Sequence, residues 1–471
     1  MMNKLIGLQP ARVFHYFEEI AAIPHGSGNT AEISDYCVKF AKTHGLAVAQ
    51  DKLGNVIIKK AATAGYEDHP AVILQGHLDM VCEKAPECAI DFEKDGLDLA
   101  IDGDWLFANG TTLGGDDGIA VAMALAILES NDLPHPPLEA LFTVDEEIGL
   151  LGAAGLNGAP LEGRLLINID SEDEGVLTVS CAGGLRADVT LPIERIDNSW
   201  NTYKITVNGL QGGHSGVEID KGRLNANIVM GQFLNTLETY RIVRIEGGQK
   251  DNVIPRKTTC VLATTKDITK LGEAFARDHR VAGDPDLTVT VEHSTEEKYT
   301  LTDESTRRIV EFLMNVPNGI ISMSEEIDGL VQTSLNLGVL KTEDDIVKAG
   351  FGLRSSVNAE KMALLDRVKT VAEACGGSCE SSGDYPAWEF QPNSRLRDTM
   401  CVVWERLYST QAKVIAIHAG LECGFLCEKL PGLDAVSIGP DMQDIHTCRE
   451  RLSISSSERV YRYVCEILKN L

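Results

Sequence analysis

The chain has 471 residues, of which 44% are hydrophobic and 24% are charged, a composition typical of a globular protein with a large core. This composition excludes collagen-like, low-complexity and disordered chains. Acidic residues outnumber basic ones by 70 to 43, and the resulting formal net charge of −27 argues against nucleic acid or an anionic membrane as a partner.

No targeting or membrane segment is expected. No apolar run reaches the roughly 18 residues that a membrane span requires, and the N-terminal stretch meets charge too early for a signal peptide. The 12 cysteines form no CxxC pair, and several lie inside apolar stretches. Buried reduced thiols are therefore favoured over disulfides or a zinc knuckle, and we expect a cytoplasmic protein.

Helix-like and strand-like segments alternate over the N-terminal part of the chain. The helical periodicity covers Arg12–Ile20, Ala31–His44 and Gly118–Glu129. Short apolar runs with strand character cover Asn55–Lys59, Ala71–Gln75, Ala140–Thr143 and Leu165–Ile169. The alternation predicts an α/β sheet with helices on its faces, in which these strands are central and buried.

From about Gly183 the pattern changes to that of an antiparallel α+β insert. Helices are predicted at Asn225–Tyr240, Ser305–Asn315 and Lys361–Ala374. Strands are predicted at Tyr203–Asn208, Arg241–Glu246, Thr258–Thr264, Leu287–His293, Leu330–Gly338 and Val347–Ser355.

The chain is predicted to return to the first domain near Gly383–Pro392. A helix at Arg395–Tyr408 and strands at Lys413–Ile417 and Leu433–Ile438 would complete the sheet. We therefore expect one α/β domain made from residues 1–183 and 386–471, interrupted by a second domain over residues 184–385.

Acidic residues and histidines gather where the predicted strands end, which is where open α/β sheets bind ligands. They lie in five segments: Gly76-His77-Leu78-Asp79, the loop Gly114-Gly115-Asp116-Asp117-Gly118, Asp145-Glu146-Glu147, Asp170-Ser171-Glu172 and the stretch from Asp441 to His446.

Each of these segments has an ordinary explanation when taken alone, because strand ends are polar and a single histidine is often structural. Together they point to a cation, since converging negative charges raise one another's pKa unless they are neutralised. Histidine and carboxylate ligands without cysteine suit Zn, Mn or Co. Two metals that share a carboxylate suit hydrolysis.

The order and approximate spacing of these residues resemble those of the M20 metallopeptidases, in particular their aminoacyl-histidine dipeptidase branch. The resemblance extends from about Pro10 to Ser457 and implies a Zn-peptidase-like catalytic domain with a mixed sheet, interrupted by an inserted α+β lid domain. The strings that carry it are QGHLDMV, TLGGDDGIA, TVDEEIGLLGA, NIDSEDEG, GLQGGHSGVEI, GRLNAN, HAGLECG and IGPDMQDIH.

The resemblance implies two Zn²⁺ ions per chain, for which Co²⁺ or Mn²⁺ can substitute. His77 and Asp170 would hold one ion. Glu147 and His446 would hold the other, and Asp116 would bridge the two.

Two further residues would act beside the metals. Asp79 would orient the imidazole of His77. Glu146 would be the general base, taking a proton from the water that bridges the metals and returning it to the leaving amine. The resemblance also implies a cis peptide bond between Asp116 and Asp117.

The inserted domain would supply groups that bind the substrate. His214, in the string GGHSG, would hydrogen-bond the carbonyl oxygen and stabilise the oxyanion. Asn252 and Arg354 would bind the substrate's terminal carboxylate, although Arg354 could equally be an exposed charge at a strand end. For the free amino group, Asp117, Glu174 and Glu422 are all candidates that the sequence does not rank.

The predicted activity is the metal-dependent hydrolysis of unblocked dipeptides, including Xaa-His, by a cytoplasmic homodimer. Three alternatives remain: an M20-type tripeptidase, an N-acyl amino acid deacylase, and a non-catalytic protein that binds peptide or metal. Glu146 favours an enzyme, because a binding protein has no need of an uncoordinated carboxylate beside the water.

Overall fold

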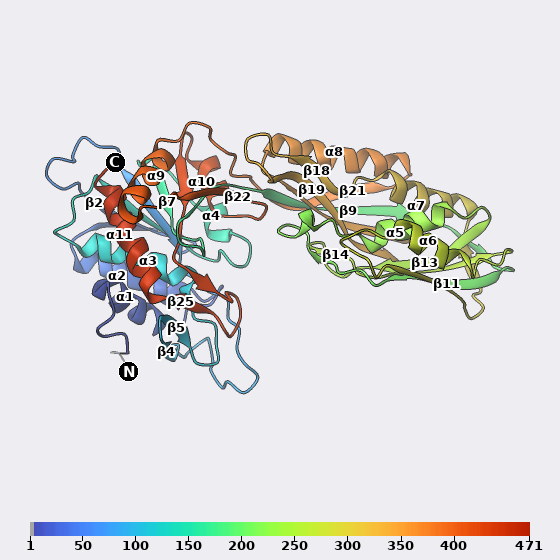
Figure 1. Cartoon of the computed structure of the whole chain (residues 1–471), viewed down its shortest axis with the longest axis horizontal. Coiled ribbons are helices and arrows are strands. Elements are labelled where there is room, and N and C mark those ends of the chain that lie inside the picture. Colours follow the sequence, from blue (N-terminus) through green and yellow to red (C-terminus); the bar gives the residue numbers. More distant parts are fainter. Residues whose placement is uncertain (1–3) are drawn as a thin grey trace. The chain divides into compact units, whose positions relative to one another are not determined.

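In the computed structural model, which describes residues 4–471, the chain folds into two units (Figure 1). Unit 1 consists of residues 4–180, Phe390–Ala416 and Leu421–Leu471, and unit 2 of Cys181–Glu389 and Ile417–Gly420. The N-terminal segments, blue in Figure 1, and the C-terminal segments, red, thus belong to the same unit. Within residues 4–471, no helix is both long and apolar enough to cross a membrane.

Unit 1 is built on a mixed eight-stranded sheet. Its centre is parallel, because β6, β3, β7 and β23 run in one direction, whereas β1, β2 and β8 run antiparallel to their neighbours. The mixed α/β fold predicted from the sequence is confirmed. In sheet order the strands are β1 Ala47–Gln50, β2 Val56–Lys60, β6 Leu138–Thr143, β3 Val72–His77, β7 Leu165–Asn168, β23 Asp434–Ser437, β8 Val176–Cys181 and β22 Lys413–Ile417.

Helix α3 is the most deeply buried helix next to this sheet. Every residue from Ile119 to Leu128 is buried, as expected of a helix that is apolar on all sides. It packs against α1 and β3. The helices of unit 1 are α1 Ala11–Ala21, α2 Ala31–Thr43, α3 Gly115–Glu129, α4 Leu151–Gly155, α9 Arg395–Tyr408, α10 Cys423–Lys429 and α11 Ile454–Leu468.

A smaller sheet in unit 1 joins an early hairpin to the C-terminal region. Its strands, in order, are β24 Met442–Gln443, β25 Arg451–Ser453, β5 Trp105–Ala108 and β4 Leu99–Asp102.

Unit 2 is built on an antiparallel nine-stranded sheet whose buried face forms a separate hydrophobic core. Eight strands form a continuous path, and β18 pairs with β19 beside it. In order the strands are β16 Thr288–His293, β11 Asn201–Asn208, β15 Thr258–Thr264, β13 Tyr240–Gly247, β19 Val331–Thr342, β20 Ile346–Ser355, β9 Gly183–Pro192 and β21 Ser378–Tyr385, with β18 at Gly319–Met323.

The helices of unit 2 pack against its sheet (Figure 1), and two short ribbons complete the unit. The helices are α5 Ala226–Asn235, α6 Leu271–His279, α7 Asp303–Asn315 and α8 Asn358–Ala374, with a 3₁₀ turn at Ile219–Lys221. The ribbons are β10 Arg195–Asp197 with β17 Tyr299–Leu301, and β12 Gly213–His214 with β14 Val253–Ile254.

One predicted helix is shorter than the sequence indicates. The prediction extended it from Asn225 to Tyr240, but α5 ends at Asn235. The backbone N–H groups of Thr236 and Leu237 bond to carbonyl oxygens only three residues earlier, which tightens the last turn. The chain then enters β13 at Tyr240.

Candidate metal centre

The parallel centre of the sheet in unit 1 brings the predicted site residues together. His77 is the last residue of β3, and Asp170 follows β7 by two residues. Glu146 and Glu147 follow β6, and His446 lies beyond β23 and β24. Because parallel strands end at the same edge of a sheet, these side chains converge there.

Asp116 lies between the two histidines. Its Oδ1 is 3.0 Å from Nε2 of His77, and its Oδ2 is 3.1 Å from Nε2 of His446. Nε2 of His77 is also 3.7 Å from Oδ1 of Asp170, and Nε2 of His446 is 2.9 Å from Oε1 of Glu147. The carboxylate of Asp116 thus joins a His77–Asp170 pair to a Glu147–His446 pair. The peptide bond after Asp116 is cis.

The nitrogen and oxygen atoms that could bind metal fall into three overlapping groups. Within each group the atoms lie no more than 4.8 Å from one another. Two groups share Asp116, and the third includes Glu146. They are His77 with Asp116 and Asp170, Asp116 with Glu147 and His446, and His77 with Glu146 and Glu147.

Asp79 fixes the orientation of His77 and of the loop beside it. Nδ1 of His77 is 3.0 Å from the backbone oxygen of Asp79 and 3.5 Å from its carboxylate. This contact leaves Nε2 facing the cluster. The same carboxylate accepts hydrogen bonds from Ser27 Oγ and from the backbone N–H groups of Glu146 and Glu147. Although burial opposes it, the hydrogen bond and charge of His77 lower the pKa of Asp79 to about 2.

The cluster contains more negative charge than its histidines neutralise. Burial lowers the pKa of His77, but the carboxylates of Asp116, Asp170 and Asp79 outweigh it and raise that pKa well above its ordinary value. Hydrogen bonds that His446 donates to the carboxylates of Asp116 and Glu147 raise its pKa to about 10. Even with these partners, burial and neighbouring carboxylates raise the pKa of Asp170 to about 6. Such a site favours a bound cation.

Glu146 belongs to the same charged environment. Burial raises the pKa of its carboxyl well above the ordinary value, and the charges of Asp170, Glu422 and Glu147 add to the shift.

The loop that carries Asp116 is held by Glu450, a residue that the sequence analysis did not single out. Its carboxylate is only 3% exposed and accepts the backbone N–H groups of four consecutive residues, at distances from 2.7 to 3.4 Å. Those residues are Leu113, Gly114, Gly115 and Asp116. No local pattern around Glu450 marks this contact, because its partners lie far away in the chain.

Of the three candidates for binding a substrate amino group, none has a carboxylate that is both exposed and unpaired, although one oxygen each of Asp117 and Glu422 has no hydrogen-bond partner in the described chain. Asp117 and Glu422 have an exposed fraction of 0%. Glu174 forms a bidentate ion pair with Arg459, whose Nε and Nη2 each donate to one carboxylate oxygen at 2.6 Å. Glu422 accepts hydrogen bonds of 2.6 Å from Gln75 Nε2 and Thr143 Oγ1. These contacts favour a supporting role for Glu422 behind the cluster, and its role in substrate binding stays a prediction.

His214 lies on β12 of unit 2 with its tautomer fixed by the backbone. The N–H groups of Gly216 and Val217 point at its Nδ1, at 3.1 and 3.3 Å. Nδ1 is therefore the acceptor, and the proton of the neutral ring lies on Nε2. Burial and the nearby Arg354 lower the pKa of His214, so the ring is neutral and presents one N–H donor.

Asn252 and Arg354 line one cavity of unit 2, with a volume of about 230 Å³. Nη1 of Arg354 donates to the hydroxyl of Tyr385 at 3.1 Å. Arg186 lines the same cavity and pairs with Asp251 at 3.1 Å. The guanidinium of Arg354 has no carboxylate within 4.0 Å among residues 4–471, so it is available to an anionic ligand.

His418 is a second residue that the sequence analysis passed over, although it opens the string HAGLECG. It is 7% exposed, its Nε2 is 2.7 Å from Ser334 Oγ, and its Nδ1 has no partner. Burial, together with the charges of Arg354 and His214, lowers its pKa to about 4.

Comparison with known proteins identifies relatives over the whole chain. The model of peptidase family M20/M25/M40 matches residues 73–470. The chain is 35% identical to the cytosol non-specific dipeptidase of Escherichia coli (strain K12), an alignment that covers 100% of this chain and 99% of that protein.

Two solved structures place the fold among peptidases. The aminoacylhistidine dipeptidase of Vibrio alginolyticus superposes with a TM-score of 0.95 at 35% identity, covering 100% of this chain and 98% of that one. The aminopeptidase PepT of Bacillus cereus has a TM-score of 0.59 at 16% identity, with 98% of each chain covered, and shares the fold alone.

Proposed function

The chain belongs to peptidase family M20/M25/M40, and on this basis we propose that it is a metal-dependent dipeptidase acting on unblocked dipeptides, including those of the Xaa-His type. Two relatives that are 35% identical over the full chain are named as dipeptidases, which supports this substrate class. The observation that carries the proposal is the single cluster of two histidines and three carboxylates with Glu146 beside it.

The donor set fits two divalent cations, because it contains only imidazole and carboxylate groups and its carboxylates outnumber the positive charges around them. We assign Zn²⁺, with Co²⁺ or Mn²⁺ as substitutes. One ion would be held by His77 and Asp170 and the other by Glu147 and His446, with Asp116 shared. When bound, the ions would polarise the peptide carbonyl and acidify water.

Glu146 is the residue we assign as the general base. It would take a proton from the attacking water and return it to the leaving amine, and both transfers need a carboxylate that is close to the metals but not bound to them. Glu147 does not meet this need, because its Oε1 already lies 2.9 Å from His446.

Three residues of unit 2 would bind the substrate. His214 would donate its Nε2–H to the carbonyl oxygen as negative charge develops there, a role that fits its neutral ring. Arg354 and Asn252 would bind the terminal carboxylate, a role supported by the cavity that they share.

Hydrolysis of a small panel by purified protein tests this proposal. The metal-stripped protein is assayed before and after addition of Zn²⁺ or Mn²⁺ with Ala-His, β-Ala-His, Leu-Gly, a tripeptide and an N-acetyl amino acid. We expect metal-dependent cleavage of the free dipeptides alone. Cleavage of the acetylated compound would indicate a deacylase, cleavage of the tripeptide a tripeptidase, and no cleavage at all a binding protein.

We also infer a cytoplasmic homodimer. Among residues 4–471 none of the 12 cysteines is in a disulfide, as in proteins of a reducing compartment, and the Escherichia coli relative is named for the cytosol. The dimer is inferred from the family resemblance. Light scattering coupled to gel filtration tests it, and a mass of 51.1 kDa, that of one chain, would contradict it.

A further inference from the structure

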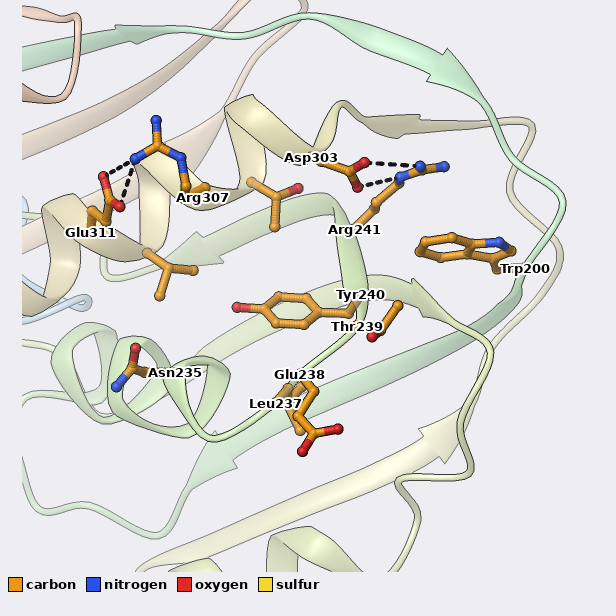
Figure 2. A pocket seen from close by; sticks show the side chains of 12 residues that line it. Trp200, Asn235, Leu237, Glu238, Thr239, Tyr240, Arg241, Asp303, Arg307 and Glu311 are labelled. Atoms are coloured by element: carbon orange, nitrogen blue, oxygen red, sulfur yellow. Dashed lines mark hydrogen bonds and ion pairs between the residues drawn. The ribbon is translucent and has the colours of Figure 1, made fainter.

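Unit 2 contains two cavities that are larger than the one lined by Asn252 and Arg354. The two differ in whether their charged side chains form ion pairs. The first lies between the end of α5 and α7 (Figure 2) and has a volume of about 590 Å³. Its arginines face carboxylates, as Figure 2 shows. Arg241 pairs with Asp303 at 2.7 and 3.1 Å and lies 4.2 Å from the ring of Trp200, and Arg307 pairs with Glu311 at 2.6 Å. This cavity has no unsatisfied charge with which to select a ligand.

The second cavity, of about 560 Å³, lies among the end of β13, the ribbon strand β14 and the start of β15. We call it the basic cavity because Lys250, Arg256 and Lys257 line it. Its only acidic lining residue is Glu246.

None of these three cations has a carboxylate within 4.0 Å among residues 4–471, although the chain has 70 acidic residues and a net charge of −27. Elsewhere in unit 2 Arg223 pairs with Glu218 and Lys266 with Glu238, whereas single cations such as Lys204 and Lys270 form no ion pair with any described residue. The basic cavity differs because three unpaired cations line it together. All three side chains are exposed and line one cavity, so an anion bound there would be attracted by three cations.

The backbone at Gly248 packs closely against a neighbouring strand at the basic cavity. Part of the cavity wall is apolar. Gly248 has φ +72°, and a Cβ there would collide with the carbonyl oxygen of Gly338 and crowd Pro255. Pro255 and the partly exposed Val253 line the wall. The volume exceeds what a bare inorganic ion fills, and this wall suits an uncharged part of a ligand.

The basic cavity is separate from the one that Asn252 and Arg354 share. The two cavities share no lining residue. Asn252 lines the cavity of Arg354, whereas Val253, the next residue, lines the basic cavity.

We propose that the basic cavity binds a small organic phosphate. Arg256 offers a planar fork that matches two phosphate oxygens, and Lys250 and Lys257 add point charges. The apolar wall of Val253 and Pro255 contacts the uncharged part of the ligand. This site is independent of the proposed hydrolysis and is tested by binding alone.

The test is calorimetric titration of the metal-loaded protein with AMP at low ionic strength, with adenosine and inorganic phosphate as reference ligands. AMP is expected to bind more tightly than either reference, because it alone satisfies both the cations and the apolar wall. The affinity should fall as salt is added. Absence of saturable AMP binding up to about 5 mM, or equal binding of adenosine, would overturn the proposal.

A pair of matched double variants locates the binding. Lys250→Gln with Lys257→Gln should weaken AMP binding by tenfold or more. Lys204→Gln with Lys270→Gln removes the same charge from exposed positions of the same unit and should change it by less than twofold. Arg256→Lys, which keeps the charge but loses the fork, should weaken binding severalfold. If both double variants weaken binding equally, or neither does, AMP binds elsewhere and the proposal is wrong.

Discussion

The metal centre of unit 1 and the surroundings of Arg354 in unit 2 shift the pKa values of their neighbours for opposite electrostatic reasons. In unit 1 the carboxylates of the metal centre crowd one another, and the pKa of Asp170 rises to about 6. In unit 2, burial and the charge of Arg354 lower the pKa of His214 and bring that of His418 to about 4. The carboxylates of the metal centre lack enough positive charge to neutralise them, and the guanidinium of Arg354 lacks a carboxylate partner within residues 4–471. The first region is complementary to cations and the second, through the guanidinium of Arg354, to anions.

Replacing Glu146 should greatly reduce catalysis while leaving the metal content of unit 1 unchanged. We expect Glu146→Gln to lower kcat on Ala-His by ~10²–10⁴, the usual contribution of a general base, because the amide accepts no proton. Metal content measured by elemental analysis should match that of the unchanged protein. Near-normal turnover would remove Glu146 as the base, and loss of metal would make it a ligand.

Replacing His214 tests the contribution of unit 2 to the same reaction. We expect His214→Ala to lower kcat by ~10²–10³, the usual effect of losing one oxyanion donor, with unchanged metal content. His279→Ala, which removes an exposed histidine from the same unit, is the control. Equal rates for the two variants would make His214 a bystander.

The neutral state of His418 predicts a pH dependence of stability that is confined to unit 2. Its folded pKa of about 4 lies below the ordinary value of 6.5, so the unfolded chain binds more protons between these pH values. Its contribution to stability is therefore complete above pH 6.5 and is lost as the pH falls towards 4.

Lowering the pH from 7 to 5 should reduce the unfolding free energy of both the unchanged protein and His418→Gln. We expect the reduction to be about 2 kcal/mol smaller in His418→Gln. Urea unfolding at the two pH values measures this difference, with His279→Gln as the exposed control. Parallel loss in all three proteins would show that His418 titrates normally.

The last effect expected is a gain of stability in unit 1. Because its surroundings raise the pKa of Asp170 from 3.8 to about 6, Asp170→Asn should stabilise the metal-free protein at pH 8 by about 3 kcal/mol. The gain should vanish at pH 4, where the carboxyl is neutral. In the presence of metal the same variant should bind less of it. Asp173→Asn, an exposed neighbour, should show neither effect, and a destabilised metal-free Asp170→Asn would contradict the idea of excess negative charge.

The sequence predicts the centre of the fold better than its edges. Strands β3, β6 and β7 are apolar on both faces because they are buried between helices, and their runs are visible without any partner. The edge strand β21, SCESSGDY, has no such run, and it is a strand only because it pairs with β9. Helix α6 has nine residues and a polar surface, which is too little periodicity to recognise.

The same contrast applies to the site. The convergence of His77, Glu147 and Asp170 follows from parallel strands ending at one edge, so the positions of these residues in the chain suffice to anticipate it. The contacts of Glu450 and His418 depend on which distant backbone or hydroxyl group comes to lie beside them. No spacing rule encodes such a contact, which exists only in the folded chain.

The order of strands in unit 1 has a consequence for synthesis on the ribosome. Strand β23 lies between β7 and β8, but it is synthesised only after all of unit 2. At about 5–20 residues per second, a nascent sheet with a missing central strand persists for many seconds. Its two open edges would be free to pair with other chains during that time. We therefore expect the folding of unit 1 to depend more strongly than that of unit 2 on chaperones that cover exposed strand edges.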